Sequence, residues 1–131
     1  KIADIARPNV RFLNRNTGSG TRLWFDMELK KLKIPAEKIN GYNQEVSTHS
    51  EAASAVRTGR ADAALGLQAA ARQHGLDFIP LFEERYDLVL PRENEDTLQP
   101  LLDYLQTSAF RNSLMVLTGY NTTHSGEQIS F

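Results

Sequence analysis

The segment VRFLNRNTGSGTRLWFDMELKKL, from Val10 to Leu32, changes its pattern twice, and this change limits the folds open to the chain. Residues Val10–Arg15 alternate apolar and polar side chains, as a strand does. A loop with two glycines follows, and apolar residues then recur at helical spacing from Thr21 onward. We expect four side chains of this helix to pack on a sheet: Leu23, Trp24, Met27 and Leu32. A strand that leads through a tight loop into a helix predicts an α/β domain.

The same alternation of strand and helix signals continues along the chain. A short strand or a turn is expected at Ile39–Glu45. Ser47, Thr48 and Ser50 are candidate N-caps of a helix that Gly59 ends. The apolar run Ala61–Leu67 is typical of a strand buried on both faces, and a short helix is expected at Gln68–Gly75. Together these segments predict a Rossmann-like, three-layer α/β fold with a mainly parallel sheet.

The C-terminal part predicts two more strands, Leu76–Phe82 and Arg85–Pro91, followed by two helices within residues 97–118. Thr97 or Ser108 can cap the starts of these helices. Residues 120–131 are predicted to form a polar tail. Because 131 residues are typical of one domain, we expect a single domain over residues 1–126.

The composition excludes several classes of protein. With 15 basic and 16 acidic residues, the net charge of −1 gives no electrostatic footprint for nucleic acid, so direct nucleic-acid binding is not expected. The absence of cysteine excludes disulfides and thiolate chemistry. No apolar run reaches the length of a membrane span, and the first residues lack the apolar core of a signal peptide. We therefore expect no membrane insertion.

The loop before the first helix has the residues of an oxyanion site. The first N–H groups of a helix have no internal partner, and the helix dipole adds about half a positive charge there. Arg15, at the end of the strand, can supply a forked counter-charge. Arg22 is a second candidate, unless its place on the helix turns it to solvent. The candidate ligand residues of this region are Arg15, Thr17, Ser19, Gly20, Thr21 and Arg22.

The same loop also suits a plain helix start, in which Ser19 or Thr21 caps the helix and the glycines form the turn. It is neither of two common nucleotide-binding loops. The G-K-[ST] ending of a Walker A loop is missing, and Leu23 stands where a dinucleotide-binding loop has its third glycine. From the residues alone, the cap and the anion site both stay open.

The second helix start contains His49. Helices that follow parallel strands begin at the carboxyl edge of the sheet, where ligands usually bind, so His49 is a candidate ligand residue as well. No carboxylate or nucleophile is spaced beside it. Three scattered histidines without cysteine predict no metal site. We therefore expect no catalytic residue, no metal ligand and no enzymatic activity in this chain.

Four blocks in this order resemble the type 2 periplasmic-binding-protein-like domains: RFLNRNTGSGTR, INGYNQEVSTHSEAASAVRTGRADAALGL, GLDFIPLFEERYDLVLP and LLDYLQTSAFRNSLMVLTGY. The chain looks most similar to the domains found behind helix-turn-helix regulators and in molybdenum-cofactor biosynthesis proteins. It resembles molybdate, tungstate and phosphate solute-binding proteins more loosely. In the phosphate-binding proteins, an arginine four residues before a Ser-Gly-Thr contacts the oxyanion, and Arg15 has this spacing to Ser19.

The resemblance covers Val10–Gly126 and implies a domain that binds a small anion without chemistry. The segment EERYDLVLP resembles the return crossover between two lobes, near residues 83–91, which makes Tyr86 a further candidate ligand residue. Such proteins hold their ligand between two lobes. The resemblance implies that this chain contains the second lobe and that the first lobe is largely missing.

We therefore expect a small-oxyanion-binding or sensing domain of a regulator, or the non-catalytic part of a molybdenum-cofactor biosynthesis protein. Molybdate or tungstate is the first candidate, sulfate and phosphate are others, and no further cofactor is implied. One alternative is a dimerisation or interaction module of a transcription regulator without an anion. The other is the solute-binding component of an ABC-type anion transporter. The implied partners are the small anion, the missing first lobe or a partner subunit, and a second copy in a homodimer. The implied location is cytoplasmic, with the periplasm as the alternative.

Overall fold

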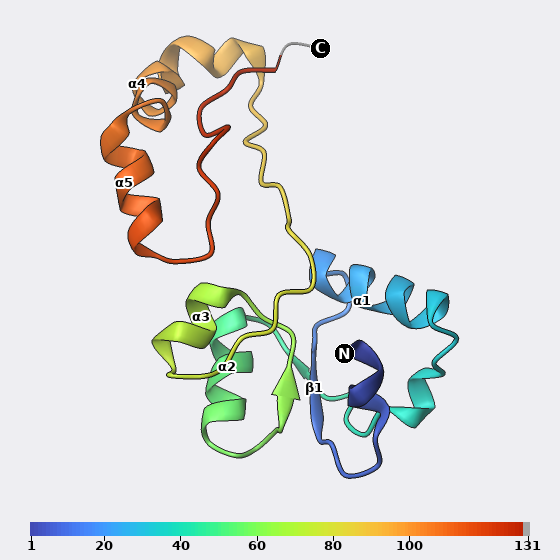
Figure 1. Cartoon of the computed structure of the whole chain (residues 1–131). Helices are drawn as coiled ribbons and strands as arrows, with labels where there is room; N and C mark the ends of the chain where they lie inside the picture. Colours follow the sequence, from blue (N-terminus) through green and yellow to red (C-terminus); the bar gives the residue numbers. More distant parts are fainter. Residues whose placement is uncertain (130–131) are drawn as a thin grey trace. The chain divides into compact units, whose positions relative to one another are not determined.

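A computed structural model of the chain describes residues 1–129. The chain divides into two compact units, Lys1–Phe78 and Ile79–Phe131. Figure 1 shows the strands in the first unit and a pair of helices in the second. Within residues 1–129, no helix is both long enough and apolar enough to span a bilayer.

The first unit is built on a three-stranded parallel sheet in the order β2–β1–β3. The central strand aligns Arg15 with Val46 of β2 and Phe12 with Ala63 of β3. This confirms the predicted α/β fold with a parallel sheet. β1 (Phe12–Arg15) and β3 (Ala63–Ala64) are shorter than the segments that predict them. β2 (Glu45–Val46) overlaps the predicted segment Ile39–Glu45 at Glu45 only, and residues 39–44 form no strand.

Each strand of this sheet leads into a helix. α1 (Gly20–Lys31) follows β1, α2 (His49–Arg57) follows β2 and α3 (Gln68–Gln73) follows β3. Short 3-10 helices lie at Ile2–Ala6 and Ala36–Lys38. The three strand–helix pairs lie in the order that the sequence predicts.

Helices cover both faces of the sheet, because neighbouring residues of β1 point to opposite sides. Phe12 is fully buried and packs against Phe25 of α1, with 5.1 Å between the ring centroids. The next residue, Leu13, packs against Ala55 of α2. Figure 1 shows α1 on one side of β1 and α2 and α3 on the other, which gives the three layers.

The buried face of α1 differs from the predicted one. Three of the expected core residues are exposed: Leu23, Met27 and Leu32. The buried residues of α1 are instead Thr21, Arg22, Phe25 and Leu29. A helix presents one stripe to a sheet, and this stripe faces inward because Phe25 and Leu29 pack with Phe12 in the core. Arg22 lies on the same stripe and forms an ion pair with Glu45 of β2.

The second unit contains the two helices predicted within residues 97–118, α4 (Glu95–Leu105) and α5 (Ser108–Val116). The cap of α5 is Thr107, one residue before the predicted Ser108, and its Oγ1 accepts the N–H of Phe110 at 3.1 Å. A 3-10 helix, Arg92–Asn94, precedes α4. None of the described residues of this unit, 79–129, is buried.

The two strands predicted at Leu76–Phe82 and Arg85–Pro91 are wrong. No residue between 76 and 91 belongs to a strand, and Figure 1 draws this segment as an irregular connection. Its alternating side chains are typical of strands, but a strand forms only where a neighbouring strand supplies backbone hydrogen bonds. The sheet of the first unit ends at β3.

The predicted polar tail, 120–131, is described up to residue 129, and residues 130 and 131 lie outside the described part. The Ser125 N–H donates to the Thr122 carbonyl at 3.1 Å, which closes a turn. Gly126 lies against the end of α4, since a Cβ built on it would be 2.9 Å from the carbonyl oxygen of Leu105. The tail therefore packs on the helix pair of the second unit.

Candidate functional site

The carboxyl edge of the sheet gathers the starts of α1 and α2. β1 and β2 are parallel and end side by side, with Arg15 opposite Val46. α1 begins after its cap, Ser19, and α2 begins after its cap, Thr48. The N-terminus of a helix carries a partial positive charge. The two helix starts therefore both add positive potential at this edge.

The start of α1 is a capped helix. The Oγ of Ser19 accepts the N–H of Arg22 at 3.2 Å, and Gly18 adopts the left-handed conformation (φ 91°) that the turn requires. The cap interpretation of this loop is therefore confirmed. Capping satisfies only part of the first turn, because the N–H groups of Gly20 and Thr21 have no acceptor within the helix. The Gly20 backbone is exposed at this edge, whereas Thr21 is buried.

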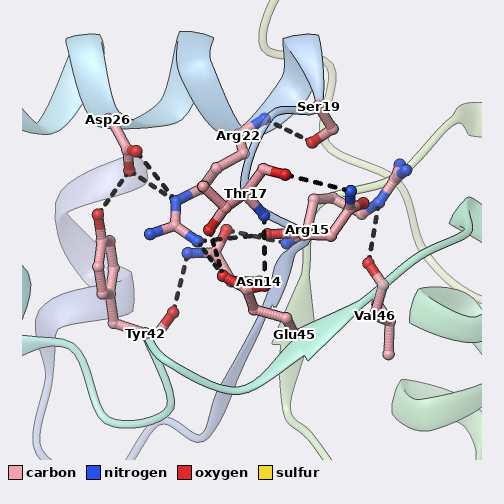
Figure 2. Close-up of polar contacts among 10 residues, drawn as sticks. Asn14, Arg15, Thr17, Ser19, Arg22, Asp26, Tyr42, Glu45 and Val46 are labelled. Atoms are coloured by element: carbon pink, nitrogen blue, oxygen red, sulfur yellow. Dashed lines mark hydrogen bonds and ion pairs between the residues drawn. The ribbon is translucent and has the colours of Figure 1, made fainter.

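Arg22 lies in a polar cluster between α1 and β2, and only 9% of it is exposed. Its Nε is 3.0 Å from Asp26 Oδ1, and its Nη1 is 2.8 Å from Glu45 Oε1. Its guanidinium lies over the ring of Tyr42, whose hydroxyl donates to Asp26 at 2.8 Å. Two carboxylates thus compensate one cation, and Arg22 does not face solvent (Figure 2).

Glu45 occupies the donors of Thr17. Its Oε1 accepts the Thr17 hydroxyl at 2.9 Å, and its Oε2 accepts the Thr17 backbone N–H at 3.2 Å. These hydrogen bonds, together with the nearby charge of Arg22, hold the pKa of Glu45 below its usual value. An internal carboxylate therefore takes the place that an oxyanion would need beside Thr17 and Arg22.

Arg15 points away from Arg22, toward Val46 (Figure 2), and only 7% of it is exposed. Its Nε donates to the carbonyl of Val46 at 3.4 Å, and its Nη2 donates to the carbonyl of Ser47 at 2.9 Å. Its Nη1 lies 2.7 and 2.9 Å from the two ring nitrogens of His49. Within residues 1–129, no carboxylate lies within 4.0 Å of its guanidinium nitrogens, so Arg15 forms no ion pair there.

His49 is the first residue of α2 and is half-buried. Burial, and then the positive charge of Arg15, lower the pKa of His49. The ring is therefore neutral at pH 7, and one of its nitrogens accepts a hydrogen bond from Arg15.

The eight predicted ligand residues fall into separate places. Arg15 meets His49, and Thr17 meets Arg22 through Glu45, whereas Ser19, Gly20 and Thr21 form the start of α1. Tyr86 belongs to the second unit, where its hydroxyl donates to Glu84 at 3.4 Å. The described part of the chain contains no group of three His, Asp or Glu side chains able to hold a metal ion.

Comparison with known proteins gives the family. The profile of the PBP superfamily domain matches residues 1–106. The chain belongs to the PBP superfamily, that of the periplasmic-binding-protein-like domains. No solved structure matches it.

Two relatives of this PBP domain are uncharacterized proteins. YvgK of Bacillus subtilis (strain 168) is 38% identical over 126 residues, which are 96% of this chain and 41% of YvgK. The chain thus spans about two fifths of the length of that relative. A protein encoded in the 5′ region of a 2Fe-2S ferredoxin gene of Clostridium pasteurianum is 34% identical over 108 residues, 80% of this chain and 96% of the relative.

Three residues of the PBP domain's polar cluster escape prediction from the sequence: Asp26, Tyr42 and Glu45. Asp26 follows Arg22 by four residues, and this spacing is itself the signal of an ion pair on a helix. Tyr42 and Glu45 belong to the stretch predicted only as a short strand or a turn. No local pattern brings them to α1, because the register of β2 beside β1 decides their place.

Proposed function

We propose that this PBP domain binds a small oxyanion at the carboxyl edge of its sheet, beside Arg15 and between the starts of α1 and α2. Molybdate and tungstate are the first candidates. The domain then serves as the ligand-binding or sensing part of a regulator or of a molybdenum-cofactor biosynthesis protein. The observation that carries the proposal is the buried guanidinium of Arg15, which lacks a carboxylate partner among the described residues.

A buried cation without a counter-charge is unfavourable, because its carbonyl and imidazole partners supply dipoles and no negative charge. The ends of α1 and α2 add positive potential at the same edge. An oxyanion there supplies the missing charge and accepts a hydrogen bond from the N–H of the exposed Gly20 at the start of α1.

The surroundings of Arg22 differ from those of Arg15, and this difference supports the proposed anion site. It is about as buried as Arg15, yet it has two carboxylate partners, Asp26 and Glu45. The chain therefore compensates a buried arginine where its own residues can do so. At Arg15 the compensation is left to a ligand.

Isothermal titration calorimetry of the full chain with molybdate, tungstate, sulfate and phosphate tests the proposal. We expect Arg15→Gln to lower the affinity by about 10- to 100-fold, the effect of one charged hydrogen bond worth roughly 1.5–3 kcal/mol. Arg15→Lys keeps the charge without the forked geometry and should retain part of the binding.

The matched control for this titration is Arg57→Gln at the exposed end of α2, which should leave the affinity unchanged. Circular dichroism of each variant verifies the fold. The proposal fails if none of the four anions gives heat with the wild-type chain, or if Arg15→Gln and Arg57→Gln bind equally well.

A second candidate function is an interaction module, in which the helix pair of the second unit packs on a partner subunit or a second copy. The observation that favours it is the exposure of apolar side chains at the end of α5, where Val116 is 82% exposed. Sedimentation velocity over a range of concentrations tests self-association. This function alone is favoured if a dimer forms and no anion alters it.

A further inference from the structure

We propose that His49 controls the access of the anion to Arg15, so that the anion binds together with one proton taken up by His49. The inference rests on the proposed function of the same site. The anion then contacts both Arg15 and His49, and acid strengthens its binding.

The N–H donors of Arg15 are divided between backbone carbonyls and His49. Backbone carbonyls accept from one edge of the guanidinium, through Nε to Val46 and Nη2 to Ser47. The remaining corner, Nη1, faces both ring nitrogens of His49 at 2.7 and 2.9 Å. Backbone carbonyls accept two of the five N–H groups of the guanidinium, and the neutral imidazole accepts one from Nη1. An oxyanion that replaces His49 as the acceptor of this N–H has to displace the imidazole.

The titratable and charged groups around His49 come from β1, α2 and α3. From β1 it faces Arg15, the one charged group that perturbs its titration. On its own helix, the carboxylate of Glu51 accepts the N–H groups of Ser47 and Thr48. From α3, His74 lies beside the hydroxyl of the neighbouring Ser50, at 3.4 Å. His49 therefore has a cation as its charged neighbour and no carboxylate ion-pair partner in the described chain.

Protonation of His49 changes its contact with Arg15. Protonated His49 loses its acceptor nitrogen and cannot receive the hydrogen bond of Arg15. Two cations would then lie together in a half-buried place, which is unfavourable unless an anion joins them. With an anion present, both side chains become donors to it. Burial and the charge of Arg15 lower the pKa of His49 in the free protein, which agrees with this. We expect a bound anion to raise that pKa again, because an opposite charge favours the protonated ring.

The direction of the pH effect follows from linkage. The complex holds one more proton than the free protein, so acid favours binding. The affinity should rise by up to about tenfold for each pH unit lowered, over the range between the pKa of His49 in the free protein and its higher pKa in the complex. A doubly charged oxyanion should also gain more than a singly charged one, because it meets two cations.

Sulfate is the probe of choice, because it remains a dianion throughout the pH range used. Calorimetric titrations of the full chain at about pH 5.5, 6.5 and 7.5, in two buffers of different ionisation enthalpy, give the affinity and the number of protons taken up. We expect uptake approaching one proton and tighter binding at the lower pH values. His49→Gln should bind sulfate with little pH dependence and no uptake. The matched control, His74→Gln, should behave as the wild-type chain.

The outcomes separate the two proposals. Sulfate binding by the wild-type chain without proton uptake overturns the role of His49 and leaves the anion site standing, as does uptake that persists in His49→Gln. Absence of binding at every pH overturns both. If His49→Gln fails to fold, NMR titration of the wild-type His49 ring decides: its pKa should rise on addition of sulfate, and an unchanged value overturns the inference.

Discussion

Two arginines that lie seven residues apart meet opposite electrostatic surroundings in this domain. Arg22 has two carboxylates within 3.0 Å, whereas Arg15 has carbonyls and an imidazole. The difference arises from the alternation of side chains along β1 and from the register that brings Glu45 beside Asn14. Glu45 thus lies on the side of Arg22, where it joins Asp26 of α1, and away from Arg15.

The position of β2 depends in turn on one glycine. Gly41 lies just before β2 with φ +96°, and a Cβ built on it would be 2.0 Å from the carbonyl oxygen of Phe12 in β1. We expect Gly41→Ala to lower the free energy of unfolding by about 2 kcal/mol or more, since the left-handed conformation alone costs roughly 1–2 kcal/mol. Urea denaturation measures the change.

The control for this substitution is Gly59→Ala, which has a similar φ of +72° but no atom within 4 Å of the added Cβ. It should cost about 1 kcal/mol, the conformational part alone. Equal losses for the two variants would show that β1 yields to the added methyl group and that the close approach does not matter.

At the scale of elements, the sequence indicates the strand–helix pairs but not every contact between them. The segments around β1, α1 and α2 carry local signals: alternation, helical spacing and caps. The predicted face of α1 is wrong because Phe25 and Leu29 pack on Phe12 of β1, and Arg22 on the same face is accommodated by Glu45 of β2. The predicted strands at Leu76–Pro91 have the right alternation but no neighbouring strand to pair with. Local patterns report preferences, and tertiary pairing decides whether these are realised.

The start of α2 is an element whose local signal can be tested. Thr48 Oγ1 accepts the N–H of Glu51 at 3.1 Å, and the Glu51 carboxylate accepts the N–H of Thr48 at 3.0 Å, which forms a capping box. We expect Thr48→Ala to reduce the stability of the first unit by about 1 kcal/mol. Chemical denaturation followed by Trp24 fluorescence reports on this unit. Thr107→Ala, which removes the cap of α5 in the second unit, should leave the same transition unchanged.

At the scale of the whole molecule, the two units differ in how they bury apolar surface. The first has core side chains on both faces of its sheet, among them Phe12, Phe25 and Leu13. In the second, helices α4 and α5 contact each other through Tyr104 and Phe110, with 5.6 Å between the rings. None of its described residues is buried, so little hydrophobic free energy is available to order the helix pair by itself.

This difference predicts that the two units have unequal stability. A fragment of residues 1–78 should fold and unfold cooperatively in urea, because it contains the sheet, α1–α3 and the core. A fragment of residues 79–131 should give little helical circular dichroism and no cooperative transition, because an isolated pair of short helices is marginal in water. Calorimetry of the full chain should then show one transition, at the temperature of the first fragment. A cooperative transition in the 79–131 fragment would contradict this, and so would a 1–78 fragment that is unfolded alone.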